Sequence, residues 1–292
     1  MNITIVIISY RSLEKLTDCI KSIGKNINII VIENSNLKYI KESIEADFKN
    51  CKVVLNNSNL GYAKAANIGF KLVKTKYAFL LNTDVVVLES QIYEIENEIA
   101  QLKDGFALAS PYSDDLLDFN KNNQFDKFFT DILINFNNEK FSKVDIVKGC
   151  SLLVNLEKFI NKDVFDNNYF FFFEEIDLCR NIKNQGENIY VLNKIKIDHK
   201  NAKSINESLN LKYQDFRHWN YFWGRFYYFK KHYGFLYSLV IHLSKLTRFG
   251  FNILRYFFLS KQLYKKNKFR FLGLFNSIIG RSSKVSVKII ER

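Results

Sequence analysis

The sequence has little proline, little glycine and no long uncharged apolar run. Proline occurs once and glycine 11 times in 292 residues, which excludes collagen-like and Pro-rich chains. The most apolar stretch, residues 235–260, is interrupted by four His, Lys or Arg residues, which argues against a membrane-spanning helix. The first eight residues have no basic segment before their apolar run, so we expect no signal peptide.

Cysteine is also scarce, and no two of the four cysteines are close in sequence. They are Cys19, Cys51, Cys150 and Cys179. No C-x-x-C pair occurs, so the spacing indicates neither a zinc site nor a dense disulfide framework. We expect buried free thiols in a reducing cytoplasm.

Acidic residues are absent from most of the last quarter of the chain. Residues 216–290 contain 15 Lys or Arg and no Asp or Glu, and they hold 21 of the 46 aromatic residues. Residues 1–215 are nearly neutral. Residues 216–290 therefore carry the whole excess of positive charge in a chain whose net charge is +13. The sequence therefore predicts two domains, residues 1–212 and a basic, aromatic, helical region at 213–292.

Strand-like and helix-like segments alternate through the first domain. Apolar β-branched runs predict strands, and i, i+3, i+4 spacing predicts the helices between them. The expected strands are 3–8, 29–32, 52–55, 77–81, 105–109, 189–192 and 194–197, and helices are expected at 12–23, 61–74 and 89–102. This order predicts an α/β fold with a mixed, mainly parallel sheet covered by helices on both faces. Residues 114–143 have poor periodicity and are interpreted as an acceptor-side loop.

Polar residues follow four successive strands. They are Ser9, Tyr10 and Arg11; Glu33; Asn59, Gly61 and Asn67; and Asn82 and Asp84. Because parallel sheets bind ligands at the carboxyl ends of their strands, these groups predict one pocket. No G-x-G-x-x-G follows the first strand, which argues against a dinucleotide site.

Three sets of residues have two interpretations each. Asp84 is either a turn residue or a ligand for Mg²⁺ or Mn²⁺ bound to a diphosphate. His199 is either structural or a metal ligand. Glu174, Glu175 and Asp177 follow five aromatic residues, and they are either acids at a helix N-terminus or candidates for general-base catalysis.

Six segments together resemble family 2 glycosyltransferases of the GT-A fold, particularly bacterial rhamnosyltransferase-like members. The matching segments are Val6–Tyr10, Val31–Ser35, Asn59–Gly69, Leu80–Val85, Lys148–Val154 and Phe172–Arg180. The resemblance implies an inverting, metal-dependent glycosyltransferase that takes a sugar, rhamnose among the candidates, from a dTDP- or UDP-linked donor.

The resemblance also implies roles for single residues. Ser9, Tyr10 and Glu33 would contact the base and ribose, with Arg11 beside them, and Asn59, Gly61 and Asn67 would shape the nucleotide pocket. Asn82-Thr83-Asp84 stands at the family's D-x-D motif, so Asp84 would hold Mg²⁺ or Mn²⁺, completed by His199. Glu175 would be the catalytic base. Asn82, Glu33 and Glu175 each replace an Asp of the family pattern.

The segment 237–260 predicts an amphipathic helix. An apolar stripe runs through Leu239, Leu243, Leu246, Gly250, Ile253 and Phe257, and cations lie opposite. This pattern is typical of a helix in an anionic membrane interface, and the upstream rings of Trp219, Tyr221, Trp223, Tyr227 and Tyr228 suit the headgroup region. The alternative is a helix packed on the catalytic domain.

These features favour one function over two others. The first hypothesis is sugar transfer to a lipid-linked or cell-surface saccharide, as in O-antigen or other polysaccharide biosynthesis, by a cytoplasmic enzyme peripheral on the inner face of the cell membrane. A nucleotidyltransferase and a non-catalytic carbohydrate-binding membrane protein are the alternatives. No nucleic-acid motif accompanies the basic aromatic surface, so no nucleic-acid partner is expected.

Overall fold

The computed structural model describes residues 1–102, 105–114, 116, 126–129, 139–199 and 207–283, with the side chain of His199 and those of 207–213 left out. The chain forms two compact units. The first comprises Met1–Asp166 and Glu175–Ala202, and the second comprises Asn167–Glu174 and Lys203–Arg292. The predicted division after residue 212 did not anticipate that the aromatic segment 167–174 joins the second unit. We call the two the catalytic unit and the helical unit.

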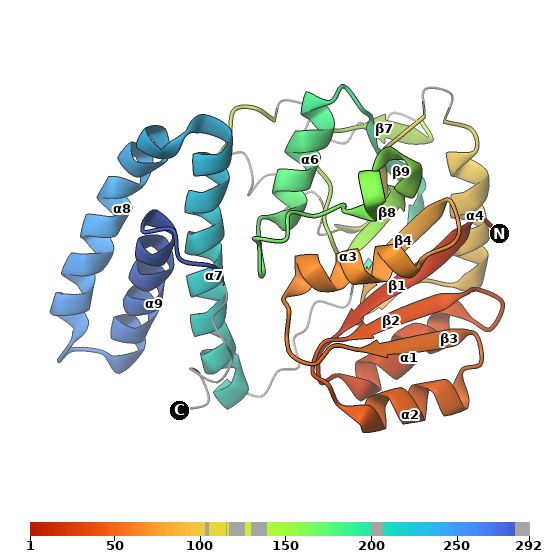
Figure 1. Cartoon of the computed structure of the whole chain (residues 1–292), viewed down its shortest axis with the longest axis horizontal. Coiled ribbons are helices and arrows are strands. Elements are labelled where there is room, and N and C mark those ends of the chain that lie inside the picture. Colours follow the sequence, from red (N-terminus) through yellow and green to blue (C-terminus); the bar gives the residue numbers. More distant parts are fainter. Residues whose placement is uncertain (103–104, 115, 117–125, 130–138, 200–206, 284–292) are drawn as a thin grey trace. The chain divides into compact units, whose positions relative to one another are not determined.

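The catalytic unit contains a mixed eight-stranded sheet in the order β3-β2-β1-β4-β8-β6-β9-β7 (Figure 1). Strands β3, β2, β1 and β4 are parallel, whereas β8 is antiparallel to both of its neighbours. The strands are β1 (Ile3–Ser9), β2 (Ile29–Glu33), β3 (Cys51–Leu55), β4 (Tyr77–Asn82), β5 (Val85–Val86), β6 (Leu108–Tyr112), β7 (Phe141–Lys143), β8 (Ser151–Asn155), β9 (Ile189–Lys196) and β10 (Asp198–His199). The helices of this part are α1 (Leu13–Ile23), α2 (Lys38–Asp47), α3 (Tyr62–Leu72), α4 (Glu89–Ile99) and α6 (Glu174–Asn184), with short turns η1 (Leu156–Lys158) and η2 (Ile160–Lys162). The predicted α/β class is confirmed.

Helices cover both faces of the parallel half of the sheet. Alternate residues of β1, Ile3, Ile5 and Ile7, join a fully buried cluster with the apolar sides of α1, α2 and α4. The opposite face of β1 meets α3 at Gly69, where a Cβ atom would lie 2.5 Å from Val6 Cγ1. Period-2 alternation therefore fixes which side of each strand meets which helix.

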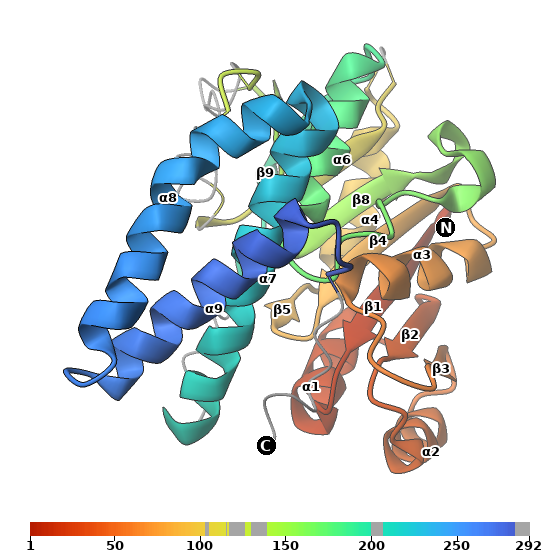
Figure 2. The same ribbon diagram turned by 60° about the vertical axis from the view of Figure 1, so that its left-hand side comes forward.

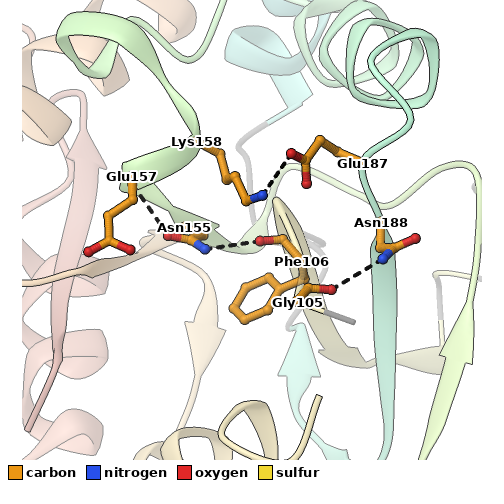
Figure 3. A network of polar contacts seen from close by, with 7 residues as sticks. All are labelled: Gly105, Phe106, Asn155, Glu157, Lys158, Glu187 and Asn188. Atoms are coloured by element: carbon orange, nitrogen blue, oxygen red, sulfur yellow. Dashed lines mark hydrogen bonds and ion pairs between the residues drawn. The ribbon is translucent and has the colours of Figure 1, made fainter. Parts of the chain in front are cut away.

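Asparagine side chains hold the segment before β6, which begins later than predicted (Figure 3). Asn155 Nδ2 donates to the Phe106 carbonyl at 3.1 Å, and Asn188 Nδ2 donates to the Gly105 carbonyl at 3.3 Å. Because these bonds take the carbonyls of 105–106, the ladder starts at Leu108 and not at Gly105 as expected. The two strands predicted at 189–192 and 194–197 form one strand, β9.

The helical unit consists of α7 (Glu207–Tyr233), α8 (Phe235–Tyr256) and α9 (Lys261–Ile278), which lie side by side (Figures 1 and 2). Helix α9 approaches α7 closely, since a Cβ on Gly273 would lie 2.2 Å from the Trp219 carbonyl oxygen. Trp219, Trp223 and Tyr228 are buried, and Trp223 Nε1 donates to the Arg281 carbonyl at 2.9 Å. These three rings are therefore not available to a headgroup layer, whereas Tyr221 and Tyr227 of the same prediction are half-buried.

The structure also shows the state of the cysteines and the character of the described helices. All four cysteines are free and buried. Within the described residues, no helix combines the length and the apolar character that crossing a bilayer requires.

Candidate active site

The site is built from the ends of β1 and β2, where Ser9 and Glu33 are register partners. Both side chains are fully buried. Glu33 Oε1 accepts from the Ser35 amide at 3.0 Å and from the Arg11 amide at 3.4 Å. Ser9 Oγ and Glu33 Oε2 have no hydrogen-bond partner. A buried polar atom left unpaired costs free energy, so this pair is suited to a polar ligand.

Tyr10 and Arg11 continue from the end of β1. Arg11 has a left-handed backbone with φ of 53°, and its guanidinium carbon lies 5.5 Å from the centroid of the Tyr10 ring. The Tyr10 side chain is half-buried and Arg11 is exposed. An aromatic ring beside a cation offers a stacking surface directly after Ser9 in the chain.

An amide network centred on Asn34 holds the loop between β3 and α3. Asn34 Nδ2 donates to Asn59 Oδ1 at 3.0 Å and to the Gly61 carbonyl at 3.2 Å. Its Oδ1 accepts from Asn56 Nδ2 and from the Leu60 amide, both at 3.0 Å. Asn59 and Gly61 thus lie beside Asn34, at the end of β2. Neither Asn34 nor Asn56 was given a role from the sequence, and their only signal was an asparagine directly after each strand.

Asn67 lies on α3 and is buried. Its Nδ2 donates to the Phe165 carbonyl at 2.8 Å, and its Oδ1 accepts from the amides of Val164 and Phe165 at 3.1 and 3.0 Å. The amide therefore fixes the backbone at 164–165. In this structure its role is to position that segment.

Tyr62, which the sequence analysis missed, joins the end of β4 to the loop before β8. Its hydroxyl lies 3.1 Å from Asn82 Oδ1 and 2.9 Å from the Gly149 carbonyl oxygen. Gly149 in turn packs against Glu175, because a Cβ there would lie 3.5 Å from Glu175 Cβ. Hence Asn82 and Glu175, 93 positions apart by number, lie near the same tyrosine and glycine.

Asp84 lies in the turn between β4 and β5, two residues after Asn82. Strand β10 pairs with β5 so that His199 is opposite Val85, the residue after Asp84. The backbone thus brings the two predicted metal ligands together. The negative charge of Asp84 also adds to burial in raising the pKa of the Cys19 thiol to about 12.

The described residues contain no group of three or more His, Cys, Asp or Glu side chains able to hold a metal ion, and the His199 side chain lies outside them. The Asp84 carboxylate nevertheless offers hard oxygens, the ligands that Mg²⁺ and Mn²⁺ prefer. A site with one carboxylate fits a cation whose other ligands come from a diphosphate and water.

Glu175 stands in the first turn of α6, beside Gly149. Its Oε2 is buried without a hydrogen-bond partner. Burial raises the pKa of the Glu175 carboxyl, while a backbone hydrogen bond and the charge of Lys148 oppose the rise. A buried carboxyl with a raised pKa and an available oxygen is equipped to accept a proton from a ligand hydroxyl.

The other acids of α6 have structural surroundings. Glu174 is buried at the start of the helix, and Asp177 is buried and accepts from Asn181 Nδ2 at 3.2 Å. Arg180, one turn further, forms a buried ion pair with Asp126 at 2.7 Å. Residue 126 belongs to the predicted acceptor-side loop, most of which lies outside the described residues.

A groove of about 430 Å³ lies elsewhere in the catalytic unit, between α2 and the edge strand β3. None of the predicted site residues line it.

Comparison with known proteins agrees with this geometry. The profile described as "Glycosyl transferase family 2" matches residues 4–158. Among solved structures, mannosyltransferase PcManGT from Pyrobaculum calidifontis in complex with GDP-Man and Mn²⁺ has a TM-score of 0.57 at 10% identity, and the match covers 95% of this chain and 87% of that one. S. aureus TarS 1–349 has a TM-score of 0.49 at 11% identity, with coverage of 96% and 92%. No curated protein sequence matches the chain.

The mixed, mainly parallel sheet with helices on both faces has the GT-A fold. Because the family profile covers more than half of its residues, the chain belongs to glycosyl transferase family 2.

Proposed function

We propose that the protein transfers a sugar from a nucleoside-diphosphate donor to a saccharide hydroxyl with inversion, using Glu175 as the base. The observation that carries this proposal is the Glu175 carboxyl, which has one oxygen buried without a partner and a raised pKa. It accepts the proton of the acceptor hydroxyl while that oxygen bonds to the anomeric carbon. The bond from that carbon to the diphosphate breaks, the nucleoside diphosphate leaves, and a single displacement gives inversion.

The donor is held by the ends of β1 and β2. Ser9 Oγ and Glu33 Oε2 are the partnerless atoms there, so a ribose or base fits them, with Tyr10 and Arg11 alongside. Asp84, with His199 across from Val85, would hold Mg²⁺ or Mn²⁺. When bound, such an ion neutralises charge on the diphosphate leaving group. The PcManGT structure with GDP-Man and Mn²⁺ supports this combination. The sequence resemblance favours dTDP- or UDP-sugars, with dTDP-rhamnose first.

The acceptor we propose is a lipid-linked saccharide at the inner face of the cell membrane. The support is the charge of the helical region, where residues 216–290 contain 15 cations and no acid. A cationic, aromatic region suits anionic lipid phosphates.

Thermal shift with nucleotide sugars tests the donor site. A donor at 100 times its Kd stabilises the folded protein by about 2.7 kcal/mol, so we expect a higher Tm with the correct nucleotide sugar and a further rise with Mn²⁺. Asp84→Ala should remove the metal-dependent part only. Unchanged metal titration in Asp84→Ala would take Asp84 out of the site, and donor binding without turnover over varied acceptors would support a carbohydrate-binding protein instead.

A further inference from the structure

Helix α8 has polar residues on its inward side. Ser238 and His242 are buried, and each bonds to a backbone carbonyl. Ser238 Oγ donates to the Phe226 carbonyl at 2.9 Å, and His242 Nδ1 lies 2.8 Å from the Ser238 carbonyl oxygen. Phe249 completes this inward side, stacking edge-on with Phe222 of α7. The side of α8 that packs within the unit is therefore partly polar.

The outward side of α8 is apolar. Its large exposed side chains are three, four or eight positions apart and so fall on one helix face, with the exposed Thr247 between Leu243 and Phe251. They are Leu236 (76% exposed), Val240 (73%), Leu243 (52%), Phe251 (66%) and Leu254 (76%). The turn to α9 adds Phe257 (58%), Phe258 (91%) and Leu259 (72%). We call these eight residues the outer face. A helix with polar groups inside and leucines outside is inverted relative to a helix packed in water.

The outer face differs from the stripe predicted from the sequence. Leu239, Leu246 and Ile253 of that stripe are half-buried, and only Leu243 and Phe257 belong to both sets. At about 100° per residue, the centre of the exposed face is turned by roughly 80° from the predicted one. The exposed apolar face of α8 is therefore a different face from the stripe expected from the sequence.

Cations lie beside the outer face. Arg248 and Arg255 of α8 are exposed, as are Lys261, Lys265 and Lys268 of α9. Residues 216–290 contain no acid. If the outer faces of two copies met, their cations would therefore face one another and repel, which disfavours a dimer through this surface. An apolar surface whose charged neighbours in the described residues are all cations is complementary to a bilayer whose headgroups are anionic.

We propose that the outer face enters the headgroup and upper acyl layer of an anionic bilayer, with α8 lying along the membrane surface. This inference rests on the part of the proposed function that places the acceptor in lipid, and it names the surface and the lipid charge involved. The leucine and phenylalanine side chains enter the apolar layer, while the arginines and lysines of α8 and α9 contact lipid phosphates.

Site-specific fluorescence tests the inference with minimal change to the fold. All four native cysteines are buried, so a single introduced cysteine is labelled selectively. We expect an environment-sensitive probe at Leu254→Cys or Phe258→Cys to brighten and shift to the blue with vesicles containing phosphatidylglycerol. The same probe at Ile160→Cys, an exposed apolar site of the catalytic unit (87%), is the matched control and should not change. No change at Leu254 and Phe258 would overturn the proposal.

Vesicle sedimentation distinguishes an anionic bilayer from the other possible partners of the outer face. Wild type should bind phosphatidylglycerol vesicles at least tenfold more tightly than phosphatidylcholine vesicles, and Leu254→Asp/Phe258→Asp should lose at least tenfold. Equal binding by that variant, indifference to lipid charge, or protection of the probe by dimer formation without lipid would each overturn the inference. Glu175→Gln should keep vesicle binding, and the double variant should keep its donor-induced thermal shift, so failure of the surface is distinguishable from failure of the active site.

Discussion

Among the described residues, three buried oxygens at the active site have no hydrogen-bond partner: Ser9 Oγ, Glu33 Oε2 and Glu175 Oε2. Each such atom costs about 1–3 kcal/mol when buried without a hydrogen bond. Neighbouring groups show that the fold can satisfy polar atoms here, since the four bonds at the Asn34 amide are all made. A ligand with hydroxyl groups would supply the hydrogen bonds that these three oxygens lack.

Glu175→Gln removes the proposed base and keeps the shape of the side chain. We expect sugar transfer to fall by about 10²–10⁴-fold, the usual contribution of general-base catalysis. Since burial raises the pKa of Glu175, the carboxyl group keeps its proton to a higher pH in the folded protein than in the unfolded chain. Once the pH exceeds the ordinary pKa of a glutamate, the buried carboxyl group therefore lowers the stability of the fold. The Gln variant should thus have a higher Tm near pH 7.5. The exposed Glu157→Gln is the control, and retained transfer would refute the assignment.

Lys148 lowers the pKa of Glu175 through its positive charge. Lys148→Gln removes this charge, so the pKa of Glu175 should rise further and the acid limb of kcat/KM should move to higher pH. Lys143→Gln, an exposed lysine in β7, is the matched control and should leave the limb in place. A pH profile of kcat/KM from pH 4 to 9 measures both; coincident limbs for Lys148→Gln and wild type would contradict the electrostatic role.

At the scale of elements, the close approach of α3 to β1 depends on Gly69. In Gly69→Ala the new Cβ would meet Val6 at 2.5 Å. Overpacking costs about 1–3 kcal/mol, which outweighs the gain of about 1 kcal/mol in helix propensity. We expect a lower Tm and weaker donor binding, because α3 also carries Tyr62. Gly250→Ala on α8 is the control, since its Cβ would make an ordinary 3.7 Å contact with Phe271, and it should not lose stability.

The elements predicted correctly from the sequence are those whose own pattern determines them. The β-branched run of β1 and the spacing of α1 needed no information from the rest of the chain. Features that depend on distant partners were missed. Residues 105–107 look like a strand, but Asn155 and Asn188 fix them, and Tyr62 gave no signal that its hydroxyl would reach Asn82 and Gly149.

The same limit applies to the strand ends and to α8. Asn or Ser after a strand marks a turn in any protein, so the pattern alone left Asn34 indistinguishable from a turn residue. For α8, the apolar positions span more than one face, and packing against α7 and α9 decides which part is covered. A periodicity count contains no information about those neighbours.

At the scale of the whole chain, the two units differ in how charge is balanced. The catalytic unit pairs its buried cation Arg180 with Asp126, whereas the described part of the helical unit has no acid after Asp215. The pKa values of two histidines in the helical unit reflect burial and this excess of positive charge. Burial and the charges of Arg270, Lys266 and Arg217 lower the pKa of His218 to about 4, and burial with Arg225 and Lys245 lowers that of His242 to about 4.

The helical unit should therefore lose stability in mild acid before the catalytic unit does. A histidine with a folded pKa near 4 and an unfolded pKa of about 6.5 contributes stability above that upper value, and the contribution is lost as pH falls from about 6.5 toward 4. His242 shows the structural reason, because its Nδ1 proton goes to the Ser238 carbonyl and a second proton would sit on a buried Nε2 with no acceptor. Burial raises the pKa of Asp215, so the contribution of this group to stability increases as the pH falls, opposite to that of the histidines. Asp215 is therefore kept in the variants.

Tryptophan fluorescence isolates this transition, because the chain has two tryptophans and both, Trp219 and Trp223, lie in α7. We expect the urea midpoint followed by fluorescence to fall between pH 6.5 and 4.5, while the donor-induced thermal shift, which reports the catalytic unit, changes less. His218→Gln/His242→Gln replaces both titrating rings with neutral amides and should flatten the pH dependence of the fluorescence midpoint. An unchanged slope in that variant would mean that groups other than these histidines link the helical unit to pH.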